Sequence, residues 1–204
     1  MVAVMVLAAG MSRRYAGENK LLLPFGRGTV ISTVVTSVAH SAARPIVIVT
    51  GHQATQVEEA LGGLSPFPIA FVHNPDYQTG EMLSSIKTGI RYLLPGSATA
   101  VMVVLGDQPL IPLHLIERLA VAFERGCGDL IAPRFGIDGR RGHPVVIGRR
   151  WWDNVLALPA GGNVRDLLTA NRTRLTCLVV SRDYAFGDID TPEAYREALT
   201  RTTE

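Results

Sequence analysis

The opening stretch MVAVMVLAAG, residues 1–10, decides the fold class of this 204-residue chain. Residues 2–7 are an unbroken apolar run rich in branched side chains, which is typical of a central strand covered on both faces. Ala8, Ala9 and Gly10 then replace the large side chains with small ones. A signal peptide needs a basic N-terminal region and a longer apolar run, so the stretch predicts a buried strand followed by a tight loop.

Strand and helix patterns alternate along the rest of the chain. Further strands are predicted at residues 45–50, 69–72, 100–105, 129–132, 144–147 and 175–180. Helices are predicted at residues 29–42, 53–61, 80–94, 151–158, 163–171 and 192–200, with another that begins at Pro112. This alternation predicts a three-layer α/β fold, in which helices flank a mostly parallel central sheet. No linker or repeat divides the chain, so we expect residues 1–204 to form a single domain.

Composition removes several classes of function. The formal net charge is +2 and the basic residues form no stripe interleaved with aromatic side chains, so nucleic acid is not an expected partner. No apolar run approaches the ~20 residues that cross a membrane, and we expect a soluble, cytoplasmic protein. Cys127 and Cys177 lack the spacing of a metal site, and we expect both to be small buried side chains in a reducing compartment.

The loop after the first strand, residues 8–20, is the first candidate for a binding site, because ligands of parallel sheets bind beyond the carboxyl ends of the strands, near a switch in strand order. Its small residues would let backbone amides approach phosphate oxygens, and Arg14 and Lys20 could neutralise a triphosphate. The loop matches neither the dinucleotide-binding glycine pattern nor the P-loop pattern. A structural turn with surface cations explains the loop alone equally well, but its place after the first strand favours phosphate binding.

Two carboxylates also stand where strands end. Asp107 follows the strand predicted at residues 100–105, and Asp190 precedes the helix that starts at Pro192. In a site for Mg²⁺, one or two carboxylates usually act together with substrate phosphates and water. Asp107 could instead cap a turn, and Asp190 could cap the following helix. Two such sites at the strand exits of one sheet favour a shared Mg²⁺.

Four motifs occur in order along the chain: LAAG-x-S-x-R with Lys20 after it, GDQP at residues 106–109, GHP at residues 142–144 and DIDTPE at residues 188–193. Together they resemble the MobA-like nucleotidyltransferases, and within that group the molybdenum cofactor cytidylyltransferases. The resemblance extends from about Val4 to Tyr195. It implies a Rossmann-like fold and transfer of a nucleotidyl group from a nucleoside triphosphate with release of pyrophosphate.

The resemblance also implies roles for individual residues. Lys20, Asp107 and Arg14 would be catalytic, and Asp107 and Asp190 would hold Mg²⁺, with Asp188 as the alternative second ligand. Guanylyl-transferring relatives tend to carry glycine at the position of Ala9, which points to CTP. The residues implied to bind the triphosphate are Leu7, Ala8, Ala9, Gly10, Ser12, Arg14, Lys20, Gly51, Gly80, Ser84, Gly106 and Asp107. Those implied to bind the acceptor are Asn74, Ser85, Gln108, Pro109, His143 and Arg165.

The implied acceptor is a phosphate-bearing small molecule, the molybdopterin cofactor, and a molybdenum hydroxylase is an implied transient partner. A phosphate nucleophile is ionised near neutral pH, which fits a sequence without an obvious Ser/His/Asp or Cys/His arrangement. Two alternatives stay open: an enzyme that acts on a sugar or alditol phosphate, and a non-catalytic chaperone for a pterin cofactor. The combination of Lys20, Asp107 and Asp190 favours catalysis, because a carrier needs none of the three.

Overall fold

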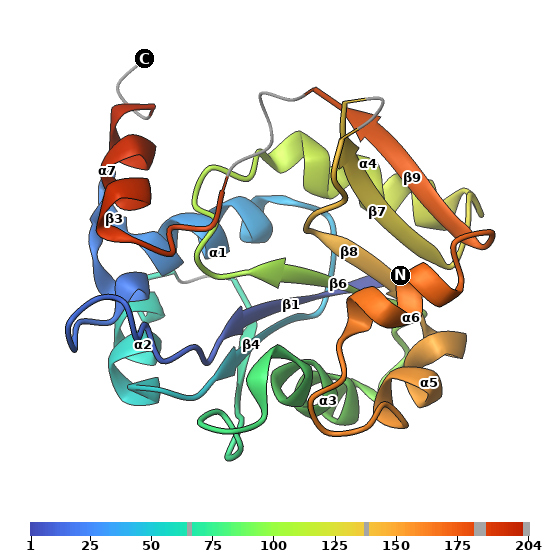
Figure 1. Cartoon of the computed structure of the whole chain (residues 1–204), viewed down its shortest axis with the longest axis horizontal. Coiled ribbons are helices and arrows are strands. Elements are labelled where there is room, and N and C mark those ends of the chain that lie inside the picture. The colour runs from blue at the N-terminus through green and yellow to red at the C-terminus, as the bar shows by residue number, and fades with distance from the viewer. Residues whose placement is uncertain (65–66, 137–138, 182–186, 202–204) are drawn as a thin grey trace.

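The computed structural model describes residues 1–64, 67–136, 139–181 and 187–201. Within these residues, seven strands form one sheet flanked by helices (Figure 1). The strands lie in the order β5 (Ile69–His73), β4 (Ile46–Thr50), β1 (Val2–Ala8), β6 (Ala100–Leu105), β8 (Val145–Gly148), β7 (Leu130–Phe135) and β9 (Leu175–Val180). The prediction of a three-layer α/β fold is confirmed.

The sheet is parallel except at β8, which runs antiparallel to both of its neighbours, β6 and β7. Parallel partners need a crossover connection of about a dozen residues or more, usually a helix. The connection from β7 to β8, residues 136–144, is shorter than that. The chain therefore turns back on itself there, and the prediction of a mostly parallel sheet is confirmed.

Helices cover both faces of the sheet. One face carries α1 (Val30–His40), α2 (Ala54–Leu61), α4 (Leu113–Glu124) and α7 (Pro192–Thr200). The other face carries α3 (Glu81–Leu93), α5 (Trp152–Leu156) and α6 (Val164–Ala170). Val4 of β1 packs toward the first face and Met5 toward the second, and both are 0% exposed. Burial on both sides explains why the first strand is an unbroken apolar run rather than an alternating one.

The order of the strands changes direction around β1. The chain leaves β1 for β4 and β5 on one side and then returns to form β6 on the other side. Such a switch point opens a crevice at the carboxyl ends of the strands. Directly after β6, the backbone N–H of Gly106 donates to the carbonyl oxygen of Leu7 at 3.0 Å. A Cβ at residue 106 would lie 2.7 Å from the same oxygen, so this close approach requires glycine.

Four short elements among the described residues were missed by the sequence reasoning, one of which is the 3₁₀ turn η2 (Arg149–Trp151) just before α5. A 3₁₀ turn, η1 (Lys20–Leu22), follows the loop after β1, and β2 (Pro24–Phe25) pairs with β3 (Gly28–Thr29). Two- and three-residue elements are shorter than any period that a hydrophobic pattern can reveal.

The prediction of two buried cysteines is wrong. Cys127 is exposed, and Cys177 is only partly buried. Cys127 lies in the turn after α4, and Cys177 belongs to β9, which is the edge strand of the sheet. None of the described helices is long and apolar enough to span a membrane.

Candidate active site

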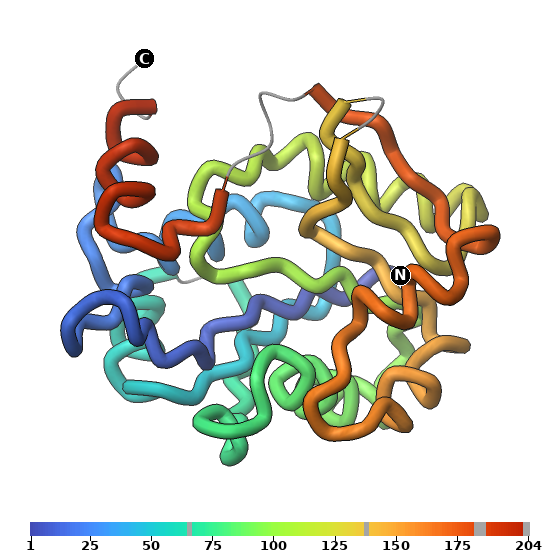
Figure 2. Tube along the Cα trace, in the orientation of Figure 1, coloured from blue at the N-terminus to red at the C-terminus, as the bar shows by residue number. Residues whose placement is uncertain are grey.

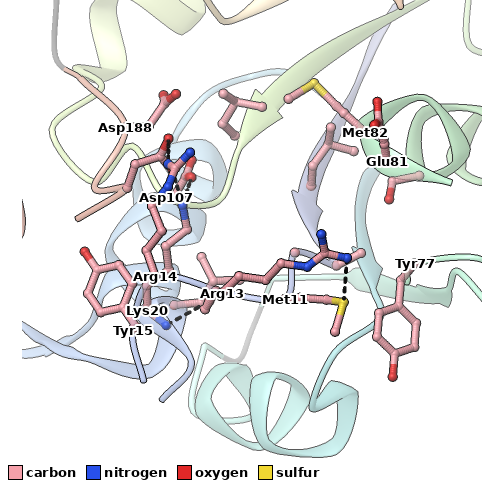
Figure 3. Close-up of a pocket in the computed structure, with 18 of the residues that line it drawn as sticks. Met11, Arg13, Arg14, Tyr15, Lys20, Tyr77, Glu81, Met82, Asp107 and Asp188 are labelled. Atoms are coloured by element: carbon pink, nitrogen blue, oxygen red, sulfur yellow. Dashed lines mark hydrogen bonds and ion pairs between the residues drawn. The ribbon is translucent and has the colours of Figure 1, made fainter. Parts of the chain in front are cut away.

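A cavity of about 510 Å³ lies at the carboxyl ends of β1 and β6. Its wall is formed by the loop after β1, by residues that follow β6, by part of segment 187–190, and by the beginning of α3 with the residues just before it. Figure 3 shows Arg14, Lys20, Asp107 and Asp188 at one end, opposite Tyr77, Glu81 and Met82, whereas Arg13 extends toward the side of Tyr77. The cavity therefore occupies the place where sequence reasoning expected a ligand.

Lys20 is the centre of the charged end. Its Nζ atom lies 2.5 Å from Oδ2 of Asp107 and 2.7 Å from Oδ1 of Asp190. The side chains of Lys20 and Asp107 are only 13% and 17% exposed. Arg14 approaches from the solvent side, where its Nη1 atom lies 2.9 Å from Oδ2 of Asp190. The structure thus brings together the three predicted catalytic residues and the second predicted metal ligand.

The charges of this group are mutually stabilised. Burial alone would lower the pKa of Lys20, but the carboxylates of Asp107 and Asp190 outweigh it and raise this pKa. Burial alone would raise the pKa of Asp190, but hydrogen bonds and charge from Lys20 and Arg14 outweigh it, and the net pKa is lowered. Lys20 is therefore protonated and Asp190 ionised at neutral pH.

Asp188 lies in a different environment. Burial and the nearby Asp107 carboxylate raise its pKa. The Nε2 atom of Gln108 donates a hydrogen bond of 2.5 Å to Oδ1 of Asp188. Asp188 therefore adds negative charge close to Asp107 without an ion-pair partner among the described residues, which distinguishes it from Asp190.

Carboxylates outnumber cations on the cavity wall. The wall carries Arg13, Arg14 and Lys20 against Glu81, Asp107, Asp188 and Asp190. A triphosphate is itself strongly negative, so it enters such a cavity favourably only together with additional cations. Among the described residues, no group of three or more Asp, Glu, His or Cys side chains is arranged so that it could hold a metal ion by itself. Asp107 and Asp190 nevertheless both contact one cation, the ammonium group of Lys20. This arrangement fits a Mg²⁺ site in which phosphate oxygens and water supply the remaining ligands.

The loop after β1 is closed by hydrogen bonds of its own. The backbone N–H of Lys20 donates to Oγ of Ser12 at 3.1 Å, and the Ser12 hydroxyl donates to Oδ1 of Asn19 at 3.4 Å. Asn19, which is 4% exposed, also caps η1 by accepting from the backbone N–H of Leu21. Ser12 therefore shapes the loop as well as lining the cavity, and Asn19 is a positioning residue that sequence reasoning missed.

Tyr15 joins this loop to the far end of the chain. Its buried hydroxyl group lies 2.8 Å from the carbonyl oxygen of Ile189 and 2.7 Å from that of Thr191. The backbone N–H of Ile189 in turn donates to the carbonyl oxygen of Asp107 at 3.2 Å. In Figure 2 the blue loop after β1 lies beside the red segment before α7. These contacts hold Asp190 next to Lys20.

Seven of the predicted triphosphate-binding residues line the cavity, and the other five do not. Gly80 and Ser84 line a second cavity instead, and the remaining three are Ala8, Gly51 and Gly106. Gly51 shows how a residue outside the wall can still matter. A Cβ at this position would lie 2.6 Å from Cβ of Tyr77 and 2.8 Å from Cβ of Ala9, so glycine permits these two wall residues to approach each other.

Among the predicted acceptor-binding residues, Ser85 lines the cavity. Asn74 is 0% exposed and supports the wall from behind. Gln108 and Pro109 are buried after β6, where Gln108 bonds Asp188. Their contacts with an acceptor stay predictions.

His143 and Arg165 lie outside the cavity wall, on the strand β8 side. Burial is the main cause that lowers the pKa of His143 to about 4, while the charge of Asp107 opposes the shift and that of Arg165 adds to it. The imidazole is therefore neutral at physiological pH, and it lies within electrostatic reach of both residues. Arg165 is exposed at the start of α6. The acceptor-binding role of His143 and Arg165 also stays a prediction.

Sequence reasoning gave no role to several wall residues. They are Met11, Arg13, Tyr15, Tyr77, Gln78, Glu81 and Met82. Glu81 and Met82 lie in the first turn of α3, which follows the loop after β5. The rule that pointed to Asp107, that ligands lie beyond the carboxyl ends of strands, also applies to this loop. Arg13 donates to the carbonyl oxygen of Gln78 at 3.3 Å, a contact between segments that no sequence spacing reveals.

The chain is similar to known proteins over most of its length. Residues 4–175 match the model of the MobA-like NTP transferase domain. The molybdenum cofactor cytidylyltransferase of Escherichia coli (strain K12) is 27% identical over 200 residues, which cover 98% of this chain and 96% of that protein. The molybdenum cofactor guanylyltransferase of Mesorhizobium japonicum is 31% identical over 145 residues, 71% of this chain and 64% of that protein. A crystal structure from Mycobacterium tuberculosis H37Rv, a complex with manganese, shares the fold with a TM-score of 0.74 at 23% identity over 98% of each chain.

Proposed function

The chain belongs to the MobA-like NTP transferase family, and from this premise we propose that it transfers CMP from CTP to a phosphate group of the molybdopterin cofactor, with Mg²⁺ as cofactor and pyrophosphate as the second product. One observation carries the proposal. Lys20, Asp107 and Asp190, which lie far apart in the sequence, form an ion-paired group at one end of a cavity at the strand exits. A turn with surface cations would not bury the pair of Lys20 and Asp107, which are only 13% and 17% exposed.

The proposed position of the triphosphate follows from the charges. Lys20 and Arg14 are the cations of the charged end, and the small residues Ala9 and Gly10 line the cavity together with them. Lys20 is a point charge on a flexible stem, suited to move from the carboxylates to phosphate oxygens when nucleotide binds. The two carboxylates that it leaves would then hold Mg²⁺, which supplies positive charge at the α-phosphate and helps to align the reacting groups.

The proposed chemistry is an in-line displacement at the α-phosphorus. A terminal phosphate oxygen of the acceptor forms the new P–O bond, and the bond between the α-phosphorus and the bridging oxygen breaks. That oxygen keeps the electron pair and leaves as part of pyrophosphate. The nucleophile is already ionised near neutral pH, because the second pKa of a phosphate monoester is about 6. Lys20 and Arg14 would neutralise the charge that grows on the leaving group.

The acceptor is proposed to approach Asp107 from the side of His143 and Arg165. His143 is neutral, so it can orient an acceptor by hydrogen bonding without adding a charge. Arg165 is the exposed cation next to it, which suits a phosphate-bearing molecule. The name of the Escherichia coli relative supports CTP and the molybdenum cofactor as substrates. On this proposal a molybdenum hydroxylase is the class of protein that would receive the product.

The proposal is tested with a panel of the four nucleoside triphosphates, each with Mg²⁺ and the molybdopterin cofactor, scored for pyrophosphate. We expect release with CTP and loss of release in Asp107→Asn. The matched control is Asp129→Asn, which removes an equally short ion pair, to Arg150, outside the cavity wall. Near-normal release by Asp107→Asn, or no release from any triphosphate by the parent protein, would contradict the proposal.

A further inference from the structure

The second cavity, which lies beside α3, has a volume of about 470 Å³. Its wall is formed by α3, by the loop before α3 and by the turn after α5. Figure 1 shows α3 and α5 next to each other on one face of the sheet. No described residue lines both this cavity and the one at the strand exits. Sites for small molecules commonly have volumes of about 300–1,000 Å³, so a separate small molecule fits here.

The charge on the wall of the second cavity is the reverse of that in the first. Lys87 and Arg91 stand against a single carboxylate, that of Asp76. In the first cavity, carboxylates outnumber cations. The second cavity therefore attracts an anion without the help of a metal ion.

The two cations have donors to spare. Lys87 and Arg91 are four residues apart on α3, so they share one face of the helix, where two like charges by themselves are destabilising. Lys87 is half-buried and its Nζ atom donates to the carbonyl oxygen of Leu158 at 2.5 Å, which leaves two of its three donors. Arg91 is exposed, and its guanidinium has no hydrogen-bond or ion-pair partner among the described residues. A favourable position in the last turn of a helix would account for Arg91 but not for Lys87 beside it.

Asp76 lies at the other end of the second cavity. Its carbonyl oxygen accepts from the backbone N–H of Gly80 at 2.7 Å, which places it beside the start of α3. Gly80 and Lys87 are seven residues apart, or about 10 Å along the helix axis. The carboxylate of Asp76 has no hydrogen-bond or ion-pair partner among the residues that the structure describes. The cavity thus carries an acceptor near one end and two cations near the other.

The wall between the two cavities is held by Asn74, which is 0% exposed. Its side-chain amide donates to Oγ of Ser84 at 2.8 Å and to Oγ of Ser85 at 3.0 Å. Ser84 lines the second cavity and Ser85 lines the first. The second cavity is therefore bounded by a packed, hydrogen-bonded wall, and binding there need not order this part of the chain first.

We propose that the second cavity binds a small phosphate ester of a sugar or polyol. The phosphate lies between Lys87 and Arg91, and a hydroxyl or amino donor of the organic part bonds to Asp76. A phosphate monoester carries a charge of about −1.5 to −2 near neutral pH, which matches two cations, whereas a single carboxylate would match one. The inference is independent of the proposed function, because this site needs neither a nucleotide nor Mg²⁺.

The test is calorimetric binding of glucosamine 6-phosphate, glucose 6-phosphate and glucosamine to the full chain, without nucleotide or Mg²⁺. Both phosphates are expected to bind, the amino sugar phosphate more tightly, and glucosamine is expected not to bind measurably. Arg91→Met should weaken both phosphates by about tenfold or more, because a charge-assisted hydrogen bond is lost. Asp76→Asn should remove the preference for the amino sugar phosphate. Arg118→Met, which removes an exposed cation of α4 outside both cavities, is the matched control.

Lys87→Met should weaken binding too, but Lys87 also bonds Leu158, so its melting temperature is measured alongside. Arg91→Met decides the matter because Arg91 is exposed. Saturating CTP with Mg²⁺ should leave glucosamine 6-phosphate bound, since the two cavities share no described lining residue. Complete displacement by CTP, unchanged binding in Arg91→Met, or no binding of either phosphate would overturn the inference.

A last variant separates this site from the proposed acceptor site. Binding that is lost in Arg165→Met but kept in Arg91→Met would place the phosphate beside His143 and would also overturn the inference. The proposed function is tested separately by release of pyrophosphate, so either conclusion can fail while the other stands.

Discussion

Replacing Lys20 by Met is the change that tests the charged end of the cavity most directly. Methionine keeps the length and the apolar stem of lysine but removes the ammonium group that lies between Asp107 and Asp190. Asp190 is 47% exposed and keeps its ion pair with Arg14. Asp107 is only 17% exposed and would lose its ion-pair partner. The main consequence is therefore one mostly buried carboxylate without a compensating charge.

The size of the effect can be worked out from this geometry. Removing one partner of a fully buried ion pair costs about 3–5 kcal/mol. Asp107 is partly hydrated and Asp190 keeps Arg14, so we expect a smaller loss of about 2 kcal/mol in the free energy of unfolding. In a domain of this size, that corresponds to a fall in melting temperature of roughly 4–8 °C. Mg²⁺ should restore part of the loss, because the freed carboxylates can then bind it.

The assay is thermal unfolding of Lys20→Met, Asp107→Asn and the double variant, each with and without Mg²⁺. If the loss arises from an unpaired carboxylate, the double variant should regain more than half of it, since no uncompensated charge remains. Lys87→Met is the matched control, because Lys87 donates to the carbonyl oxygen of Leu158 and not to a carboxylate. Its effect should add to that of Asp107→Asn. A double variant as unstable as the sum of its two single changes would refute the reasoning.

Three further predictions concern neighbouring residues. Tyr15→Phe should lower the free energy of unfolding by about 1 kcal/mol in urea titrations and weaken Mg²⁺-dependent CTP binding, because the hydroxyl no longer holds the segment around Ile189. Burial lowers the pKa of His143 to about 4, so its contribution to stability is present above pH 6.5 and lost as the pH falls toward 4. In His143→Gln, the free energy of unfolding should therefore depend less on pH in that range. Parallel curves for the parent protein and the variant would contradict this. Burial and Asp107 raise the pKa of Asp188, so the stability that Asp188 contributes is present below pH 3.8 and lost as the pH rises through the raised pKa. The difference in melting temperature between the parent protein and Asp188→Asn should therefore change over this range, and a constant difference would contradict this.

The sequence determined the layers of this protein because the period of apolar residues is a local property. The run at residues 2–7 is apolar throughout because β1 is covered on both faces, and the same holds for β4 and β6. Helix spacing likewise identified α1 and α3 to within a few residues. The rule that ligands lie beyond strand ends then pointed to Asp107 and to the loop after β1.

Tertiary structure alone decided which of these residues meet. Lys20 contacts Asp107 and Asp190 across 87 and 170 positions of the chain, and no local pattern encodes a contact at that separation. The tertiary structure also decided which of the adjacent residues Ser84 and Ser85 lines this cavity. Adjacent residues of a helix point about 100° apart, and only Ser85 lines it. Periodicity reports which face of an element is buried, whereas contacts between elements depend on how the whole sheet and its loops pack.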